Sequence, residues 1–249
     1  MAQKNNQSVE RAFLILEAIA DNEGIGVSDI AREVALNKST AFGIIKTLDN
    51  LGYIFKDETT DKYHSSFKLK ELGEKGSAGI GILEFARPYL EQLSKKYGEI
   101  IHFVQAEEDV VLYIDKIEST KSIRVHTGIG GMMPLYCTGV GKAILATRSK
   151  EEIMNYLNKT KLEKYTENTI TAKGDLSKEI FETKKRGYAI DNGENHEDLY
   201  CLAVAIHNKQ GQGSHAVSIS LPLFRKDNYN LDEMIDDLKK VRNKIEKYF

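Results

Sequence analysis

Cysteine is scarce in this sequence: among 249 residues there are two, Cys137 and Cys201. This count excludes a disulfide framework and a four-thiolate metal site. The six histidines show neither H-x-H nor H-x-x-x-H spacing, so no local metal-binding motif is present. These absences favour a reducing compartment, and we expect a cytoplasmic protein that needs no metal or other cofactor.

Long apolar runs are also missing. None approaches the roughly 18 residues that a transmembrane helix requires. The polar segment 1–7 lacks the apolar core of a signal peptide, so we expect no membrane partner. A strong charge of either sign is absent as well, because the net charge is −2 and residues 1–75 carry 10 Lys and Arg against 12 Asp and Glu. This balance neither supports nor excludes nucleic-acid binding, but it predicts weak non-specific affinity.

Three short helices and a β-hairpin are predicted near the N-terminus. Short polar side chains that cap free backbone N–H groups begin the three helices: Ser8, Ser28 and Asn37. Apolar residues follow each of them with helical spacing, and Gly52 ends the third helix. Strands are expected at 53–56 and 62–65, with a turn at 57–61 between them. These elements predict a compact unit over residues 1–75.

The third helix carries a polar face opposite its apolar stripe. Residues 37–47 contain two lysines and no acidic residue. Lysines, short hydroxyl donors and an exposed aromatic side chain suit contact with phosphates and with a thymine methyl group. A polar outer face is also found on any small helical bundle, but a hairpin placed directly after this helix favours a winged helix-turn-helix. The candidate DNA-binding residues are Lys38, Ser39, Thr40, Phe42, Lys46, Thr47 and Lys62.

The middle of the chain is rich in glycine. Residues 71–81 therefore predict a hinge or a loosely packed stretch. An amphipathic helix follows, bent or begun near Pro88. We interpret residues 76–97 as a linker helix between two domains.

Residues 98–249 mix hairpins with helices. Strands are expected at 100–106, 110–117, 122–127, 200–207 and 214–221. Helices are expected at 140–147, 150–158 and 174–186, and a last amphipathic helix runs from Leu231 through Ile245. This order indicates an α+β domain with an antiparallel sheet rather than a doubly wound parallel sheet.

The hairpin over residues 200–221 predicts a binding face. Folding it about its central loop pairs residues whose numbers sum to about 421, so Cys201 faces Ser220 and Ala203 faces Ser218. Strand alternation places all four on one face of the sheet. Two hydroxyls and a thiol together suggest a small polar ligand, although serines that simply face solvent would show the same pattern.

A glycine-flanked helix start supplies a second element of this site. Gly139-Val140-Gly141 begins a predicted helix, whose first N–H groups suit an anion, so a carboxylate is expected on the ligand. Asp191 would accept a hydrogen bond from a ligand hydroxyl or amine. A phosphate loop is excluded here, because Tyr136 stands at the first glycine position and Ala143 at the Ser/Thr position.

No catalytic residue is expected. Neither cysteine has a histidine at the spacing of a nucleophile motif, and a packed cysteine is the commoner alternative. A metabolic enzyme with an appended DNA-binding domain remains an alternative function, and a sensor whose N-terminal helices contact protein is another.

Several segments together resemble the IclR family of bacterial transcription regulators. In the N-terminal part they are SVERAFLILE at 8–17, SDIA at 28–31, LNKSTA at 36–41 and LDNLGYI at 48–54. In the C-terminal part they are 128–135, TGVGKAILA at 138–146, 166–171, 186–191, 201–203 and 218–220. The chain departs from the family's usual residues at Gly43, Asp198 and Ala205, where arginine, glycine and proline are usual.

The resemblance implies a DNA-binding regulator controlled by a small organic acid or a carbohydrate-derived metabolite. It assigns residues 98–249 to an effector-binding domain of GAF-like architecture. The candidate effector-binding residues are Met133, Gly139, Val140, Asp191, Leu199, Cys201, Ser218 and Ser220. The expected partners are a double-stranded DNA operator, the effector, and further copies of the chain in a homodimer or homotetramer with a first contact through residues 1–20 and 82–97.

Overall fold

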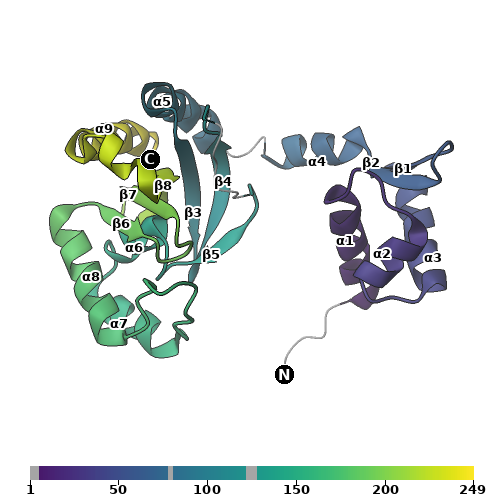
Figure 1. The fold of residues 1–249 in the computed structure, drawn as a ribbon, viewed down its shortest axis with the longest axis horizontal. Coiled ribbons are helices and arrows are strands. Elements are labelled where there is room, and N and C mark those ends of the chain that lie inside the picture. The colour runs from purple at the N-terminus through teal and green to yellow at the C-terminus, as the bar shows by residue number, and fades with distance from the viewer. Residues whose placement is uncertain (1–5, 78–80, 122–127) are drawn as a thin grey trace. The chain divides into compact units, whose positions relative to one another are not determined.

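The computed structural model describes residues 6–77, 81–121 and 128–249, and it divides the chain into two compact units (Figure 1). The first unit covers residues 1–80 and the second covers 81–249. Within the described residues no helix is both long and apolar enough to cross a membrane.

The N-terminal unit holds three helices and a hairpin. Their bounds are α1 (Gln7–Ala20), α2 (Val27–Glu33), α3 (Lys38–Asn50), β1 (Ile54–Asp57) and β2 (Lys62–Ser65). Asn37 caps α3 as predicted, since its side chain accepts from the Thr40 N–H. The prediction for α1 was wrong by two residues, because Asn6 accepts from the Ser8 N–H and starts the helix earlier. No side chain caps α2, which begins before Ser28.

A helix replaces part of the predicted hinge. Helix α4 covers Phe67–Ser77, so the prediction for residues 71–77 was wrong. Lysine, leucine and glutamate are good helix formers, and they outweigh the cost of the two glycines in this helix, about 1 kcal/mol each. The ion pair between Lys75 and Glu71, one helical turn apart, adds a small stabilisation. Residues 78–80 lie outside the described part of the chain.

The C-terminal unit contains a six-stranded antiparallel sheet with the order β5-β4-β3-β8-β7-β6. Its strands are β3 (Ile100–Glu107), β4 (Val110–Ile117), β5 (Met132–Pro134), β6 (Ala189–Asn192), β7 (Leu199–His207) and β8 (Gly213–Pro222). The predicted hairpin register is confirmed, because Cys201 pairs with Ser220 and Ala203 with Ser218. The strand expected at 122–127 lies outside the described residues.

Helices cover both faces of this sheet (Figure 1). They are α5 (Gly81–Tyr97), α6 (Gly139–Leu145), α7 (Lys150–Lys159), α8 (Lys173–Arg186) and α9 (Leu231–Ile245), with short 3-10 helices η1 (Leu223–Asn228) and η2 (Glu246–Tyr248). A capping box formed by Ser149 and Glu152 begins α7. Helix α5, expected as part of a linker, packs on the sheet through an apolar stripe that includes Ile82 and Leu90.

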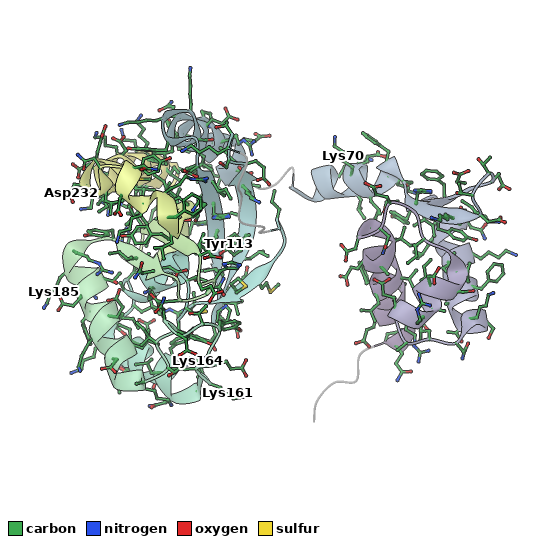
Figure 2. The ribbon with its side chains drawn as sticks, in the orientation of Figure 1. Lys70, Tyr113, Lys161, Lys164, Lys185 and Asp232 are labelled. Carbon is green, nitrogen blue, oxygen red and sulfur yellow. The ribbon has the colours of Figure 1, made fainter. Side chains whose placement is uncertain are left out.

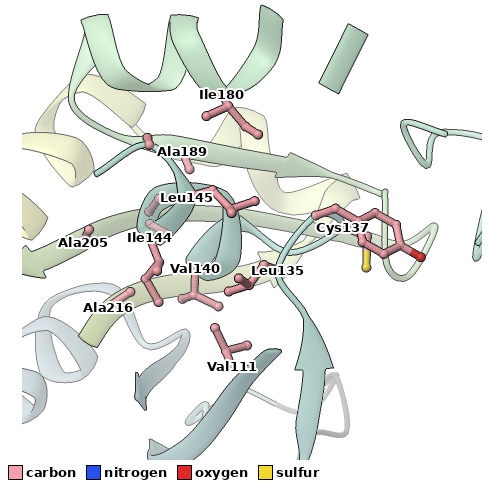
Figure 3. Close-up of a cluster of buried hydrophobic side chains, with 14 of the residues drawn as sticks. Val111, Leu135, Cys137, Val140, Ile144, Leu145, Ile180, Ala189, Ala205 and Ala216 are labelled. Atoms are coloured by element: carbon pink, nitrogen blue, oxygen red, sulfur yellow. The ribbon is translucent and has the colours of Figure 1, made fainter. Parts of the chain in front are cut away.

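The two faces of the sheet differ in their side chains. One face, which we call the apolar face, packs against α5 and α9 with residues such as Leu202, Val204 and Ile219. The other face, which we call the ligand face, packs against α6, α7 and α8 with smaller residues such as Ala203 and Ala205 (Figure 3). Alternation along each strand separates the two sets. An N-terminal helix-turn-helix and a helix-flanked antiparallel sheet confirm the α+β class.

Candidate functional site

Helix α3 presents the side chains that are expected to read DNA. Its inner positions, such as Ala41 and Ile45, are fully buried in the core of the N-terminal unit. All seven predicted DNA-binding residues lie on its outer side or on the hairpin, and Thr40 alone is half-buried while the rest are exposed. The Phe42 ring is 49% exposed, so it is accessible for contact with DNA.

The charges on this surface are uncompensated. Lys38, Lys46 and Lys62 make no ion pair within the described residues, whereas the nearby Lys56 pairs with Asp61 at 2.5 Å. Gly43 stands among them in open space, since a Cβ added there would meet nothing within 4 Å. An arginine, the family's usual residue at this position, would therefore fit here without a steric clash.

A small cavity of about 80 Å³ lies on the ligand face of the C-terminal unit. It is lined by His102, Tyr113, Thr138, Gly139, Val140, Asp191, Asn195, His196, Leu199, Cys201, Ser218 and Ser220. Seven of the eight predicted effector-binding residues are in this set. The eighth, Met133, packs instead against the buried apolar cluster of the same face.

The Ser220 hydroxyl is the centre of a buried polar network. Its Oγ lies 3.1 Å from His102 Nδ1 and accepts from the Cys201 thiol at 3.1 Å. Ser218 Oγ lies 3.4 Å from the same oxygen. Ser218 and Ser220 are 2% and 1% exposed, so the alternative that these serines face solvent is wrong.

Burial keeps the titratable groups of this network neutral. The pKa of His102 falls to about 3, because desolvation and the nearby Lys116 both oppose a charged ring. Burial raises the pKa of the Cys201 thiol well above its usual value, and the Asp191 carboxylate adds to the effect. A neutral thiol is a poor nucleophile, which agrees with the expectation of no catalytic cysteine.

Asp191 is the acidic group of the cavity. Burial raises its pKa to about 7, although the Glu194 N–H donates to Asp191 Oδ1 at 2.8 Å and opposes this shift. Glu194 forms a buried ion pair with Lys142, whose side chain is 1% exposed and also lies 3.6 Å from Glu179. This pair fixes the segment after β6 to α6, next to the cavity.

Close packing positions α6 over the cavity. A Cβ at Gly141 would lie 2.3 Å from the Leu135 carbonyl oxygen, so only glycine fits there. A Cβ at Gly139 would lie 3.4 Å from Cys201 Cβ and 3.6 Å from Asp191 Cβ, at the limit of ordinary contact. Gly139 and Val140 are the first two residues of α6, so their backbone N–H groups have no hydrogen-bond acceptor within the helix.

Sequence reasoning missed several lining residues, including His102, Tyr113 and Thr138. His102 reaches Ser220 because β3 pairs with β8, across 118 positions of the chain. No local sequence pattern predicts the pairing of these two strands. A signal for Thr138 was present, since a threonine before Gly139-Val140-Gly141 suits an N-cap, and its Oγ1 accepts from the Gly141 N–H at 3.1 Å.

Two family models match the chain. The IclR helix-turn-helix domain covers residues 8–58, and the bacterial transcriptional regulator IclR C-terminal domain covers residues 77–247. The chain belongs to the IclR family. The chain is 32% identical to the HTH-type transcriptional regulator KdgR of Escherichia coli, over 96% of this chain and 90% of that one. A crystal structure of the Thermotoga maritima IclR matches with a TM-score of 0.87 and 31% identity, over 97% and 98% of the two chains.

The family assigns the broad roles of the two units. The N-terminal unit is a DNA-binding helix-turn-helix domain, and the C-terminal unit is a ligand-binding domain. Relatives such as XynR and the repressor AllR of Escherichia coli, 29% and 28% identical over 94% and 90% of this chain, are named transcriptional regulators and not enzymes. The alternative of a metabolic enzyme is therefore wrong. Within the described residues, no three His, Cys, Asp or Glu side chains group as a metal site.

Proposed function

We propose that this IclR-family regulator is controlled by a small organic acid that binds in the cavity of the ligand face. The observation that carries this proposal is the buried network in which His102, Cys201 and Ser218 surround the Ser220 hydroxyl. On a sheet face otherwise built for packing, these polar side chains line the cavity. It supports a ligand with several hydrogen-bonding atoms.

The cavity favours a hydroxy acid. Donors for a carboxylate are the serine hydroxyls and the N–H groups of Gly139 and Val140, and among the described residues no lysine or arginine lines the cavity. Asp191 offers an acceptor to a ligand hydroxyl, and in its protonated form it donates to a carboxylate. The volume of about 80 Å³ limits the ligand to a few heavy atoms. An IclR homologue of Microbacterium hydrocarbonoxydans, which shares 22% identity and the fold, was solved with 4-hydroxybenzoate, also a hydroxy acid.

Calorimetry on the full chain tests this assignment. Small hydroxy acids such as lactate and glycerate are first screened by thermal shift, and the best binder is titrated into Ser220→Ala and Ser218→Ala. Loss of a hydrogen bond to a charged group lowers affinity by about 10- to 150-fold. Ser177→Ala on α8, outside the cavity lining, is the matched control. Equal affinity for all four proteins would remove this cavity from consideration.

We infer that α3 reads the operator through two kinds of contact. Lys46→Ala is expected to weaken binding to every sequence and to lower the salt slope by about one, as loss of a phosphate contact requires. Phe42→Ala is expected to relax preference at one base step. Fluorescence anisotropy with the upstream intergenic DNA measures both. Unchanged titrations for both variants would mean that α3 is not the reader.

We also infer that the chain works as a homodimer or homotetramer. A single winged domain contacts few base pairs, and symmetric half-sites supply the missing affinity. Exposed apolar side chains on α1 support a contact between two copies of the chain through residues 1–20. Val9, Phe13 and Leu14 are 52%, 61% and 42% exposed. Light scattering that gives a 28.1 kDa particle at micromolar concentration would contradict this inference.

A further inference from the structure

A second and larger cavity lies elsewhere in the C-terminal unit. Its volume is about 360 Å³, against about 80 Å³ for the cavity around Ser220. Residues of α6, α8, β7, the loop after β7, and α9 line it, and none of them lines the smaller cavity. Nothing in the proposed regulation by a small hydroxy acid uses this space.

Two cations at the rim of this cavity are incompletely neutralised. The Lys184 ammonium donates to the Arg148 carbonyl oxygen at 3.3 Å and has no carboxylate partner among the described residues. The Arg242 guanidinium bonds to the Asn243 side chain at 3.1 Å. Its nearest carboxylate, Glu246 at 4.0 Å, is already engaged by His207 at 2.6 Å. Both side chains therefore retain donors for an anion.

The floor and one wall of the cavity are apolar. Ala143 and Ala146 of α6 and Ala205 of β7 are buried, and their small side chains leave the space open. The Tyr188 ring forms part of the wall, and the Lys239 ammonium lies 5.5 Å from its centroid. An apolar surface next to incompletely neutralised cations suits a ligand with an apolar body and an acidic end.

We propose that this cavity is a second ligand site, specific for a small organic anion with an apolar body, such as an aromatic or branched-chain carboxylate. The carboxylate lies between Lys184 and Arg242, and the body lies over the three alanines. Carbonyl groups at the C-terminal ends of α6 and α8 oppose an anion, but this effect is small beside two cations. Charge-assisted hydrogen bonds from lysine and arginine are the stronger interaction.

The two sites are separate but share structural elements. Ala205 and Cys201 lie on the same face of β7, four residues apart, which corresponds to about 13 Å along the strand. Ala143 follows Gly139 by one turn of α6. Both ligands therefore fit at once, and each contacts the same helix and the same strand.

Ligand-observed NMR with benzoate on the full chain tests the proposal. Benzoate is expected to bind, and its uncharged analogue benzyl alcohol to bind at least fivefold more weakly. Lys184→Gln and Arg242→Gln are each expected to reduce benzoate affinity by about 5- to 10-fold, because one charge-assisted hydrogen bond is lost at a partly exposed site. Lys184 is exposed and Arg242 is half-buried, and a thermal melt confirms that each variant is folded.

Lys185→Gln is the matched control. It makes the same charge change one position further along α8, and Lys185 points outward from the unit and pairs with Glu182 (Figure 2). The proposal requires that Lys185→Gln leave benzoate affinity unchanged. It is overturned if benzoate does not bind, if Lys185→Gln weakens binding as much as Lys184→Gln, or if Ser220→Ala abolishes the signal while Lys184→Gln and Arg242→Gln do not. The last result would place benzoate in the smaller cavity alone.

Discussion

The two faces of the C-terminal sheet are formed by the same strands but carry different kinds of side chain. On the apolar face, β7 and β8 present large aliphatic residues such as Leu202 and Ile219, all fully buried under α5 and α9. On the ligand face, the same strands present Cys201, Ser218 and Ser220, equally buried but polar and small. Both faces bury apolar clusters, but the ligand face also carries the polar side chains that line the smaller cavity. The contrast separates side chains that only pack from side chains that are available to a ligand.

The largest effect is expected from the buried ion pair on the ligand side. Lys142→Ala leaves the Glu194 carboxylate buried without its cation, which costs about 3–5 kcal/mol in free energy of unfolding. Urea unfolding followed by circular dichroism measures the change. The double variant Lys142→Met with Glu194→Leu removes both charges and is expected to recover most of the loss. A single variant as stable as the original protein would contradict the prediction.

A core truncation on the apolar face is expected to cost slightly less. Leu202→Ala removes a fully buried side chain and leaves a cavity under α5 and α9, so the free energy of unfolding falls by about 3 kcal/mol. The same denaturation experiment measures this loss. Ligand affinity is expected to stay unchanged, because Leu202 faces away from both cavities. A large change in hydroxy-acid affinity would contradict the expectation that residues of the apolar face do not affect ligand binding.

The third prediction concerns pH. The pKa of Asp191 is raised by burial from 3.8 to about 7, so the folded state holds this proton more tightly than the unfolded state. The stability from this group is fully present below about pH 3.8 and is lost as the pH rises to about 7. Because asparagine does not ionise, the Asp191→Asn variant does not lose this stability as the pH rises. Between about pH 5 and about pH 7 the variant should gain about 2 kcal/mol relative to the original protein.

Paired urea titrations at these two pH values measure the gain in the Asp191→Asn variant. The buried His102 and His215, whose pKa values are lowered by burial to about 3 and about 4, titrate in both proteins, so their contribution cancels in the difference. A difference between the two proteins that does not vary with pH would show that Asp191 is ionised normally.

The smallest effect is expected from a serine of the ligand face. Ser218 Oγ makes a long contact of 3.4 Å with Ser220, so Ser218→Ala should change the free energy of unfolding by less than about 1 kcal/mol. The same variant is expected to lose affinity for the hydroxy acid. Stability measured by urea and affinity measured by calorimetry should thus respond independently. A large loss of stability would assign Ser218 a packing role instead.

Local patterns predicted much of this architecture. The register of the β7–β8 hairpin follows from its short loop and from strict alternation, and the prediction for Cys201 and Ser220 is confirmed to the residue. The α4 helix was missed, because glycines in a short segment signal a hinge more strongly than a few good helix formers signal a helix. The pairing of β3 with β8 was not predictable, since residues so far apart meet only through the whole sheet.

The cavities were predictable to different degrees. The smaller cavity followed from the hairpin and the resemblance, except for five lining residues: His102, Tyr113, Thr138, Asn195 and His196. The larger cavity was not predicted at all. Lys184 looks like part of a solvated helix end, and Arg242 like one of many charges on an amphipathic helix. Only their meeting in space, beside Ala205, gives them a shared role.

The strand order also constrains how the protein is made. The two central strands are β3 and β8, and β8 leaves the ribosome last among the strands of the sheet. During synthesis, β3 therefore has one unpaired edge until β8 is made, while the N-terminal unit already has every segment it needs to fold. A nascent chain therefore acquires its DNA-binding unit before the unit that regulates it.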